Sequence, residues 1–405
     1  MSSIHTPLPT PLAERSLAPD LARGALLLFI AIANAPWYLW TSDSRGLSAW
    51  PVEASIADRI IQSISLTAID GRSYPMFAAL FGYGIWQLYS RQRSSGTDQK
   101  SARRLLRRRH AWMLAFGLVH AALLWAGDIV GAYGLVGLII GWLFLDRGDR
   151  TLRVWIGVLS AGLLVFVVGL SLLPVPLDDE ADAVDLGLGI ATADYGESLV
   201  ERLLTWLVLT PAQALAFVVP IAMLVAILAA RHRVLEDPTA HLPLLRRAAI
   251  VGIGLGWIGG GVTAAQNANL LGLDASADPL ISALHSVTGL ACGLGYVAAF
   301  GVIAAGITTT GSFTTALRSL GSRSLTFYLA QSLVFAPLMS AWGFGLGAHL
   351  DSWSIALIAV VVWLVSLAVA AQLERRGIRG PAERLLRALA YTALAYRANR
   401  STTAP

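Results

Sequence analysis

The chain has 405 residues, of which 56% are hydrophobic and 14% are charged, and its mean hydropathy is +0.63. A water-soluble domain needs more charge to cover its surface, so this composition indicates a polytopic membrane protein and excludes an ordinary soluble enzyme. The formal net charge is +5, but the basic residues flank apolar runs instead of forming one patch, which argues against nucleic-acid binding.

Several apolar runs are continuous and about 20 residues long, the length of an α-helix that crosses a bilayer. Transmembrane barrels would instead show alternating strands of about ten residues. We therefore predict an all-α fold, a bundle of transmembrane helices. Ten spans are expected, at roughly 22–40, 73–90, 110–126, 129–145, 154–173, 203–230, 248–270, 281–307, 322–341 and 353–373.

Three regions follow from this pattern. Residues 1–20 are polar and proline-rich and lack the apolar core of a signal peptide, so we expect a disordered cytoplasmic tail there. Residues 21–373 form the membrane domain, with an N-terminal part at about 21–173 and a C-terminal part at about 203–373. Residues 374–405 are expected to form a cytoplasmic interfacial helix and tail.

The distribution of positive charge predicts the orientation of the bundle. With the N-terminus in the cytoplasm, 26 of the 30 Lys and Arg residues fall on the cytoplasmic side. The other four, Arg45, Arg59, Arg72 and Arg202, fall outside. This asymmetry follows the positive-inside rule and predicts an even number of spans, with both termini cytoplasmic.

The segments between the spans also carry patterns. Residues 55–69 begin with a capping-type serine and place three isoleucines on one face, which indicates an amphipathic helix on the outer surface. Residues 174–202 are rich in acidic side chains and predict a solvated loop, with capture of a cationic ligand as the alternative. The basic segments 103–109 and 375–397 are expected to bind anionic lipid.

One motif resembles the nucleotide-binding motif of soluble enzymes, and one cysteine is present. Residues 252–261, "GIGLGWIGGG", match a dinucleotide fingerprint, but no strand precedes them and they lie in an expected span. Close helix packing is the preferred interpretation of these glycines. Cys292 is the only cysteine, which excludes internal disulfides and thiolate clusters. No metal site is predicted.

Seven polar residues lie within the expected spans or at their outer ends, where isolated polar groups are costly. His120 precedes Gly127 by seven residues, roughly 10 Å along a helix. It is either a buried histidine satisfied by a neighbour or a general base in an internal cavity. Asp128 is either the cap of the following helix or a partner in that chemistry. The full set is Asn34, Arg72, His120, Asp128, Gln266, Asn267 and His285.

Four stretches of the sequence resemble the YeiB-like family of bacterial inner-membrane proteins, the domain of unknown function 418. They are "LARGALLLFIAIAN", "GRSYPMFAALFGYG", "LVHAALLWAGDIVGAYGLVGL" and the C-terminal pair "LGSRSLTFYLAQSLV" and "RGPAERLLRALAYT". They occur in the order of the family and span nearly the whole chain. Two departures are Phe327, where the family has Asn, and Ala22, where it has a larger residue.

The resemblance implies a helical bundle in the bacterial cytoplasmic membrane and a loose grouping with membrane acyltransferases. On that hypothesis His120 acts as the base and Asp128 orients it. Arg72, Asn34, Gln331 and Tyr328 bind the substrate, and Arg72 and Asn34 stabilise the oxyanion. Acetyl-CoA or another acyl-CoA is the expected co-substrate, and no tightly bound cofactor is expected. A transporter of a small amphiphile and a non-catalytic assembly component are the alternatives.

Overall fold

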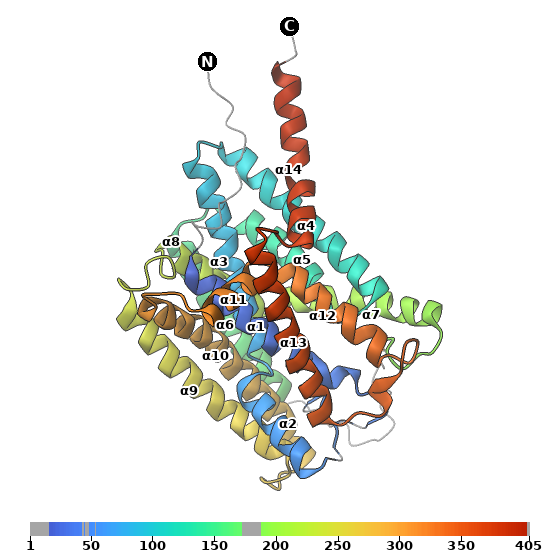
Figure 1. Cartoon of the computed structure of the whole chain (residues 1–405). Coiled ribbons are helices and arrows are strands. Elements are labelled where there is room, and N and C mark those ends of the chain that lie inside the picture. Colours follow the sequence, from blue (N-terminus) through green and yellow to red (C-terminus); the bar gives the residue numbers. More distant parts are fainter. Residues whose placement is uncertain (1–15, 43, 45–47, 53, 172–187, 403–405) are drawn as a thin grey trace.

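A computed structural model of the chain describes residues 16–42, 44, 48–52, 54–171 and 188–402. Across these residues the regular structure is helical, and no strand is present apart from one bridge between Ser44 and Pro51. The predicted all-α helical bundle is therefore confirmed (Figure 1). The elements are α1 (Leu17–Asn34), η2 (Ala35–Tyr38), α2 (Ile56–Ala68), α3 (Ser73–Ser94), α4 (Gln99–Leu123), α5 (Ile129–Leu143), α6 (Asp149–Ser171), α7 (Tyr195–Leu215), α8 (Val218–Arg231), α9 (Leu242–Asn267), η3 (Ala275–Ala277), α10 (Asp278–Gly306), α11 (Ser312–Ser322), α12 (Ser324–Met339), η4 (Leu346–Ala348), α13 (Ser352–Arg375) and α14 (Pro381–Thr402).

Each of the ten expected spans coincides with helix, but the helices differ in their capacity to cross a bilayer. Among the described residues, five are long and apolar enough by length and composition, and a sixth is formed if α7 and α8 count as one bent span. α5 and α12 are apolar but shorter. Ten spans therefore remains a prediction. The five are Leu17–Tyr38, Asp149–Gly169, Leu242–Asn267, Ala275–Gly306 and Ser352–Arg375.

The expected span at 203–230 is divided into two helices. α7 ends at Leu215, α8 begins at Val218, and the two axes differ by 48°. Pro220 has no N–H to donate to the carbonyl of Ala216, and its ring crowds that carbonyl. The helix therefore stops four residues before this proline.

α2 is amphipathic as expected, although its apolar face is the exposed one. Ile56, Ile60 and Ile64 are 80%, 55% and 54% exposed. Its buried face is polar: Gln62 donates to Ser352 Oγ at 3.0 Å, and the Asp58 carboxylate accepts the backbone N–H of Trp353. Polar contacts hold α2 against the start of α13, so the isoleucine stripe is left facing outward.

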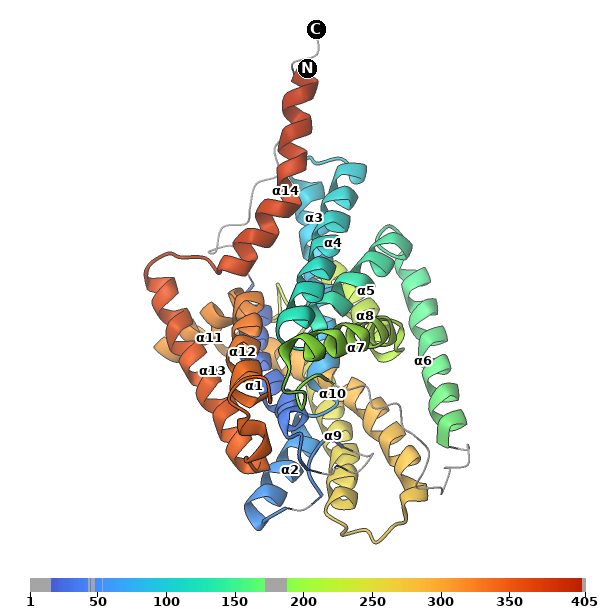
Figure 2. The ribbon, with the colours of Figure 1, turned by 90° about the vertical axis from the view of Figure 1, so that its right-hand side faces the viewer.

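The ends of the bundle differ from the sequence expectation in two places. α1 begins at Leu17, inside the segment expected to be a tail, and Asp20 is buried. The rest of that tail, residues 1–15, lies outside the described residues. α11 was not expected; it packs against α1, where Gly321 lies directly on the carbonyl of Asp20. α14 projects from the end of the bundle opposite α2 (Figures 1 and 2).

The first part of the expected acidic loop 174–202, up to residue 187, also lies outside the described part of the chain. Its described end forms the start of α7, where the carboxylate of Asp194 accepts the N–H of Glu197 at 2.9 Å. α6 stands at the edge of the bundle in Figure 2 and packs mainly on α8 and α10.

The core is built from close helix pairs. α9 and α10 pack along most of their length, and α4 and α5 form a hairpin. On α9, Gly252 and Gly256 lie against Ala291 and Cys292 of α10 so closely that a Cβ at either glycine would clash. The glycine-rich stretch is thus a helix-packing surface, which confirms the packing interpretation and removes the dinucleotide one.

Candidate functional site

His120 and Asp128 lie on either side of the turn between α4 and α5, and their side chains are hydrogen-bonded. α4 ends at Leu123, and Asp128 is the N-cap of α5. His120 Nδ1 is 2.8 Å from Asp128 Oδ1. The two residues are 4% and 1% exposed. The turn therefore folds an imidazole and a carboxylate, eight residues apart, into one buried pair.

Two glycines allow this pair to form. Gly117 lies one turn before His120, and a Cβ there would overlap both the Asp128 carboxylate and the backbone of Gly131. A Cβ on Gly134 would lie 2.6 Å from the backbone nitrogen of Leu114. The absence of side chains at these positions lets α5 approach α4 closely.

Asp128 has four hydrogen-bond donors around its carboxylate. Besides His120, it accepts the N–H of Val130 at 3.1 Å and that of Gly131 at 2.6 Å, and Trp206 Nε1 of α7 lies 3.5 Å away. Backbone N–H groups and the helix dipole stabilise negative charge at a helix N-terminus. Asp128 is thus a helix cap, as one interpretation predicted, and the same carboxylate also fixes the orientation of the imidazole.

The second ring nitrogen of His120 differs from the first. Its Nε2 is buried and has no hydrogen-bond partner among the described residues, although buried polar atoms are nearly always paired. The ring of Tyr328 lies beside it, with ring centroids 5.4 Å apart. The hydroxyl of Tyr328 accepts the N–H of Ile129 at 3.2 Å. Side chains from α4, α12 and the cap of α5 therefore meet at one buried point.

α12 is held in place by Glu383 at the start of α14. This carboxylate accepts the N–H groups of Leu325 and Thr326 at 2.8 and 3.1 Å, and it also bonds the hydroxyl of Thr326. The two C-terminal motifs of the sequence therefore form one helix cap, which positions Tyr328. Gln331, one turn further along α12, donates to the carbonyl of Leu27 in α1 at 2.9 Å.

Arg202 supports the site from α7, a role that the sequence did not predict. It is fully buried, and it donates to the carbonyls of Ala121 and Ala122 at 3.2 and 3.0 Å. Its guanidinium lies over the ring of Tyr195, 5.0 Å from the centroid. These carbonyls belong to the last turn of α4, directly after His120, so Arg202 satisfies a helix end that would otherwise be unpaired. In the sequence, the only indication of this role was the position of Arg202, a single arginine at the outer end of an expected span.

Arg72 belongs to a second polar cluster, between α3, α9 and α10. It is fully buried, and it donates to the carbonyl of Gly256 at 2.7 Å. Its Nη1 is 2.7 Å from His285 Nε2, and Thr263 Oγ1 is 3.0 Å from His285 Nδ1. No hydrogen bond or ion pair joins Arg72 to His120 or Asp128 in the described structure.

Two further polar residues complete this picture. Asp70, in the turn between α2 and α3, accepts a hydrogen bond from Trp50 Nε1 at 2.9 Å. Burial raises the pKa of Asp70 to about 6, against the opposing effects of hydrogen bonds from Trp50 and Ser65 and of the positive charge on Arg72. Asn34 is the half-buried last residue of α1. Among the predicted site residues, the structure thus gathers His120, Asp128 and Tyr328, while Arg72 lies in its own cluster.

No group of three metal-ligating side chains occurs among the described residues. Cys292 is buried on α10 against Gly256 of α9. The residues that the structure gathers around His120 are those of acid–base chemistry, a histidine, a carboxylate and a phenol.

Comparison with known proteins identifies relatives through part of the chain. Residues 229–393 match the sequence profile of the family described as "Protein of unknown function (DUF418)". The chain is 28% identical over 162 residues to "Uncharacterized protein YeiB" of Escherichia coli (strain K12), covering 40% of this chain and 38% of the relative. It is 29% identical over 163 residues to "Uncharacterized protein YxaH" of Bacillus subtilis (strain 168), covering 38% of each chain.

The matched region includes only some residues of the candidate site. The profile covers α9 to α13 in full, including α12 with Tyr328, and the first part of α14 with the cap Glu383. It does not reach the α4–α5 hairpin that carries His120 and Asp128. Each alignment spans well under half of the curated relative's length.

Proposed function

Because the chain belongs to the YeiB-like DUF418 family of unknown function, we propose its function from its own buried site: transfer of an acyl group from acyl-CoA to a hydroxyl or amine acceptor. The acceptor is an extracytoplasmic or lipid-linked molecule, and the reaction takes place in the bacterial cytoplasmic membrane. The observation that supports this proposal most is the pairing of His120 with Asp128, which leaves His120 Nε2 buried and without a protein partner.

The proposed reaction uses both nitrogens of the imidazole. Asp128 holds the proton on Nδ1, so Nε2 carries the lone pair and takes the proton from the acceptor. The acceptor oxygen or nitrogen then bonds to the thioester carbonyl carbon of acyl-CoA. The carbon–sulfur bond breaks, and the protonated His120 returns its proton to the departing CoA thiolate.

Four other residues are proposed to bind the substrates. Tyr328 lies beside the imidazole, and its hydroxyl accepts the N–H of Ile129. We propose that the hydroxyl hydrogen is donated to the substrate. Gln331 lies one turn along the same helix. Arg72 and Asn34 are proposed to bind the acceptor on the outer side.

The basic segments 103–109 and 375–397 are proposed to bind anionic lipid. Arg108 donates to the carbonyl of Leu389 at 3.0 Å, so the two segments meet where α14 packs on α4. Arginines gathered at one end of a helical bundle suit a negatively charged leaflet.

Transport of a small amphiphile is the second candidate, and one observation favours it. The 48° break between α7 and α8 is that of a discontinuous helix, and such helices line substrate sites in many transporters. α7 also carries Trp206 and Arg202, which contact the candidate site. On this hypothesis the His120–Asp128 pair carries a proton that is coupled to transport.

The test is binding of acetyl-CoA to the detergent-purified full chain by calorimetry, followed by transfer of labelled acetyl groups to membrane extracts. We expect saturable micromolar binding. We expect His120→Ala to retain binding and lose transfer by about 10²–10⁴-fold, the contribution of a general base. His232→Ala, on the exposed histidine at the end of α8, serves as the control and keeps full transfer.

Other outcomes separate the candidates. Transfer retained in His120→Ala removes His120 from the mechanism. Absence of acetyl-CoA binding by a folded sample rejects acyl transfer, and flux in proteoliposomes then tests transport. If no flux occurs and His120 and Asp128 tolerate apolar replacement, a non-catalytic assembly role follows.

A further inference from the structure

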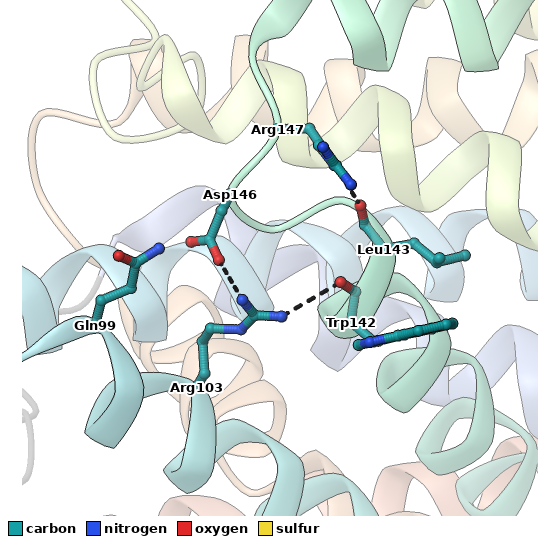
Figure 3. A pocket seen from close by; sticks show the side chains of 6 residues that line it. All are labelled: Gln99, Arg103, Trp142, Leu143, Asp146 and Arg147. Carbon is teal, nitrogen blue, oxygen red and sulfur yellow. Dashed lines mark hydrogen bonds and ion pairs between the residues drawn. The ribbon is translucent and has the colours of Figure 1, made fainter.

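A hollow of about 420 Å³ lies at the end of the bundle where α4 begins and α5 ends. Figure 3 shows its lining: Gln99, Arg103, Trp142, Leu143, Asp146 and Arg147. An adjoining hollow of about 370 Å³ shares Gln99, Asp146 and Arg147, and adds Trp86, Tyr89, Arg93, Leu145 and Arg231. Arg103 precedes His120 on α4 by 17 residues, which corresponds to about 25 Å along the helix. The hollow is therefore separate from the candidate site.

The lining of the two hollows is positively charged. Four arginines, Arg93, Arg103, Arg147 and Arg231, face one carboxylate, Asp146, so the formal charge of the lining is +3. Guanidinium groups bind phosphate through paired, charge-assisted hydrogen bonds, which makes arginine the preferred phosphate ligand at a fixed site.

The arginines differ in how much of their hydrogen-bonding capacity is already used. Arg103 donates to Asp146 at 2.8 Å and to the carbonyl of Trp142 at 3.3 Å. Arg231 is fixed by Asp149 at 2.8 Å and lies over the ring of Trp86. Arg147 uses only Nε, which donates to the carbonyl of Leu143 at 3.3 Å. Its two terminal nitrogens donate to no described residue, so an anion can take them without breaking an existing bond.

Two residues that line the hollow are apolar and exposed: Trp142 is 74% exposed and Leu143 is 38% exposed. Tryptophan concentrates at the level of lipid headgroups, where its ring contacts acyl chains and its N–H faces the polar layer. An inorganic anion would gain nothing from these apolar groups. They suit a ligand that carries both phosphate and hydrocarbon.

We propose that this hollow binds the phosphate of an anionic phospholipid, with Arg103 and Arg147 on the phosphate and Trp142 beside the acyl chains. The site lies at the end of the bundle that carries α14, which the charge distribution assigns to the cytoplasm. Of the segment 103–109, which was expected to bind anionic lipid, this proposal uses Arg103. It adds Arg147 from the turn between α5 and α6. The proposal is independent of the acyl-transfer reaction.

The experiment titrates phosphatidylglycerol into the full chain in detergent and follows the midpoint of thermal unfolding. Phosphatidylcholine tests the need for net negative charge, and adenosine 3′,5′-bisphosphate tests a soluble phosphate. The variants are Arg147→Gln, which breaks only one backbone hydrogen bond, and Arg103→Gln/Arg147→Gln. Arg233→Gln/Arg246→Gln removes the same charge at exposed positions on the same side and is the control.

We expect saturable stabilisation by phosphatidylglycerol alone, in the wild type and the control. The apparent affinity should fall severalfold in Arg147→Gln and about tenfold or more in the double variant, since each tenfold step corresponds to about 1.4 kcal/mol. Equal stabilisation by phosphatidylcholine, or unchanged affinity in the double variant, overturns the site. Arginine-dependent binding of adenosine 3′,5′-bisphosphate in place of phosphatidylglycerol overturns the lipid assignment and identifies a soluble phosphate ligand.

Discussion

Two histidines within the bundle differ in the charge of their partners: His120 contacts a carboxylate and His285 contacts a guanidinium. His120 contacts the carboxylate of Asp128 through Nδ1 and leaves Nε2 open. His285 lies against the guanidinium of Arg72, and Thr263 occupies its Nδ1. Beside a carboxylate the imidazole is a hydrogen-bond donor, whereas beside a guanidinium it is a hydrogen-bond acceptor. The first cluster is therefore suited to proton transfer and the second to holding a buried cation.

The largest effect is expected from Asp128→Asn. The amide oxygen replaces one carboxylate oxygen and can accept the N–H of Val130 or that of Gly131, so a helix cap remains. It cannot stabilise a positive charge on His120, and acyl transfer should fall about 10³–10⁴-fold. Single-turnover transfer of labelled acetyl groups measures this.

The control for that variant is another His–Asp pair. At the bundle surface, His232 Nε2 is 3.1 Å from Asp149 Oδ2. Asp149→Asn should leave transfer unchanged. Equal losses in the two variants would show that the buried position of the first pair has no special role.

Arg72→Gln should lower the free energy of unfolding by about 3 kcal/mol, because the carbonyl of Gly256 and the imidazole of His285 each lose a buried donor. Denaturation of the purified protein in detergent measures the loss, with Arg246→Gln, an exposed arginine, as the control. An unchanged stability would contradict a structural role for the second cluster.

Asp70 gives this second region a pH dependence. Its pKa of about 6 in the folded protein exceeds the value of about 4 in an unfolded chain. The folded state therefore binds the proton more tightly, and its stabilising effect is complete below pH 4. That effect is lost as the pH rises from about 4 to about 6, a decrease of roughly 2–3 kcal/mol.

Unfolding midpoints between pH 4 and pH 7 measure this change. Asp70→Asn should flatten the dependence over that interval, because the amide does not titrate and can still accept the hydrogen bond from Trp50. An equal slope in wild type and variant would assign the dependence to other groups.

The smallest effect is expected from Tyr328→Phe. The ring and its packing beside His120 remain, while the hydroxyl contact with the substrate and with the N–H of Ile129 is lost. One such hydrogen bond is equivalent to about tenfold in transfer. A KM that rises while kcat is unchanged would indicate substrate binding, and no change in either would remove Tyr328 from the site.

The helical fold followed from composition and the length of the apolar runs, and all ten expected spans coincide with helix. The break at Ala216–Phe217 was not predicted, because a proline within an apolar run can either kink or end a helix, and packing decides which. α11 was missed because its polar residues resemble a loop, and its stability comes from burial against α1.

The sequence by itself determined the class of the protein, most of its helices and two members of the site, because hydrophobicity and spacing along one chain are local properties. His120 and Asp128 are eight residues apart, so a single helical turn and a tight loop bring them together. Only the tertiary structure placed Tyr328 beside His120 and Arg202 at the end of α4, and showed Arg72 in a different cluster from His120 and Asp128. These contacts join residues 80 to about 200 positions apart, and such distances are decided by how the helices pack.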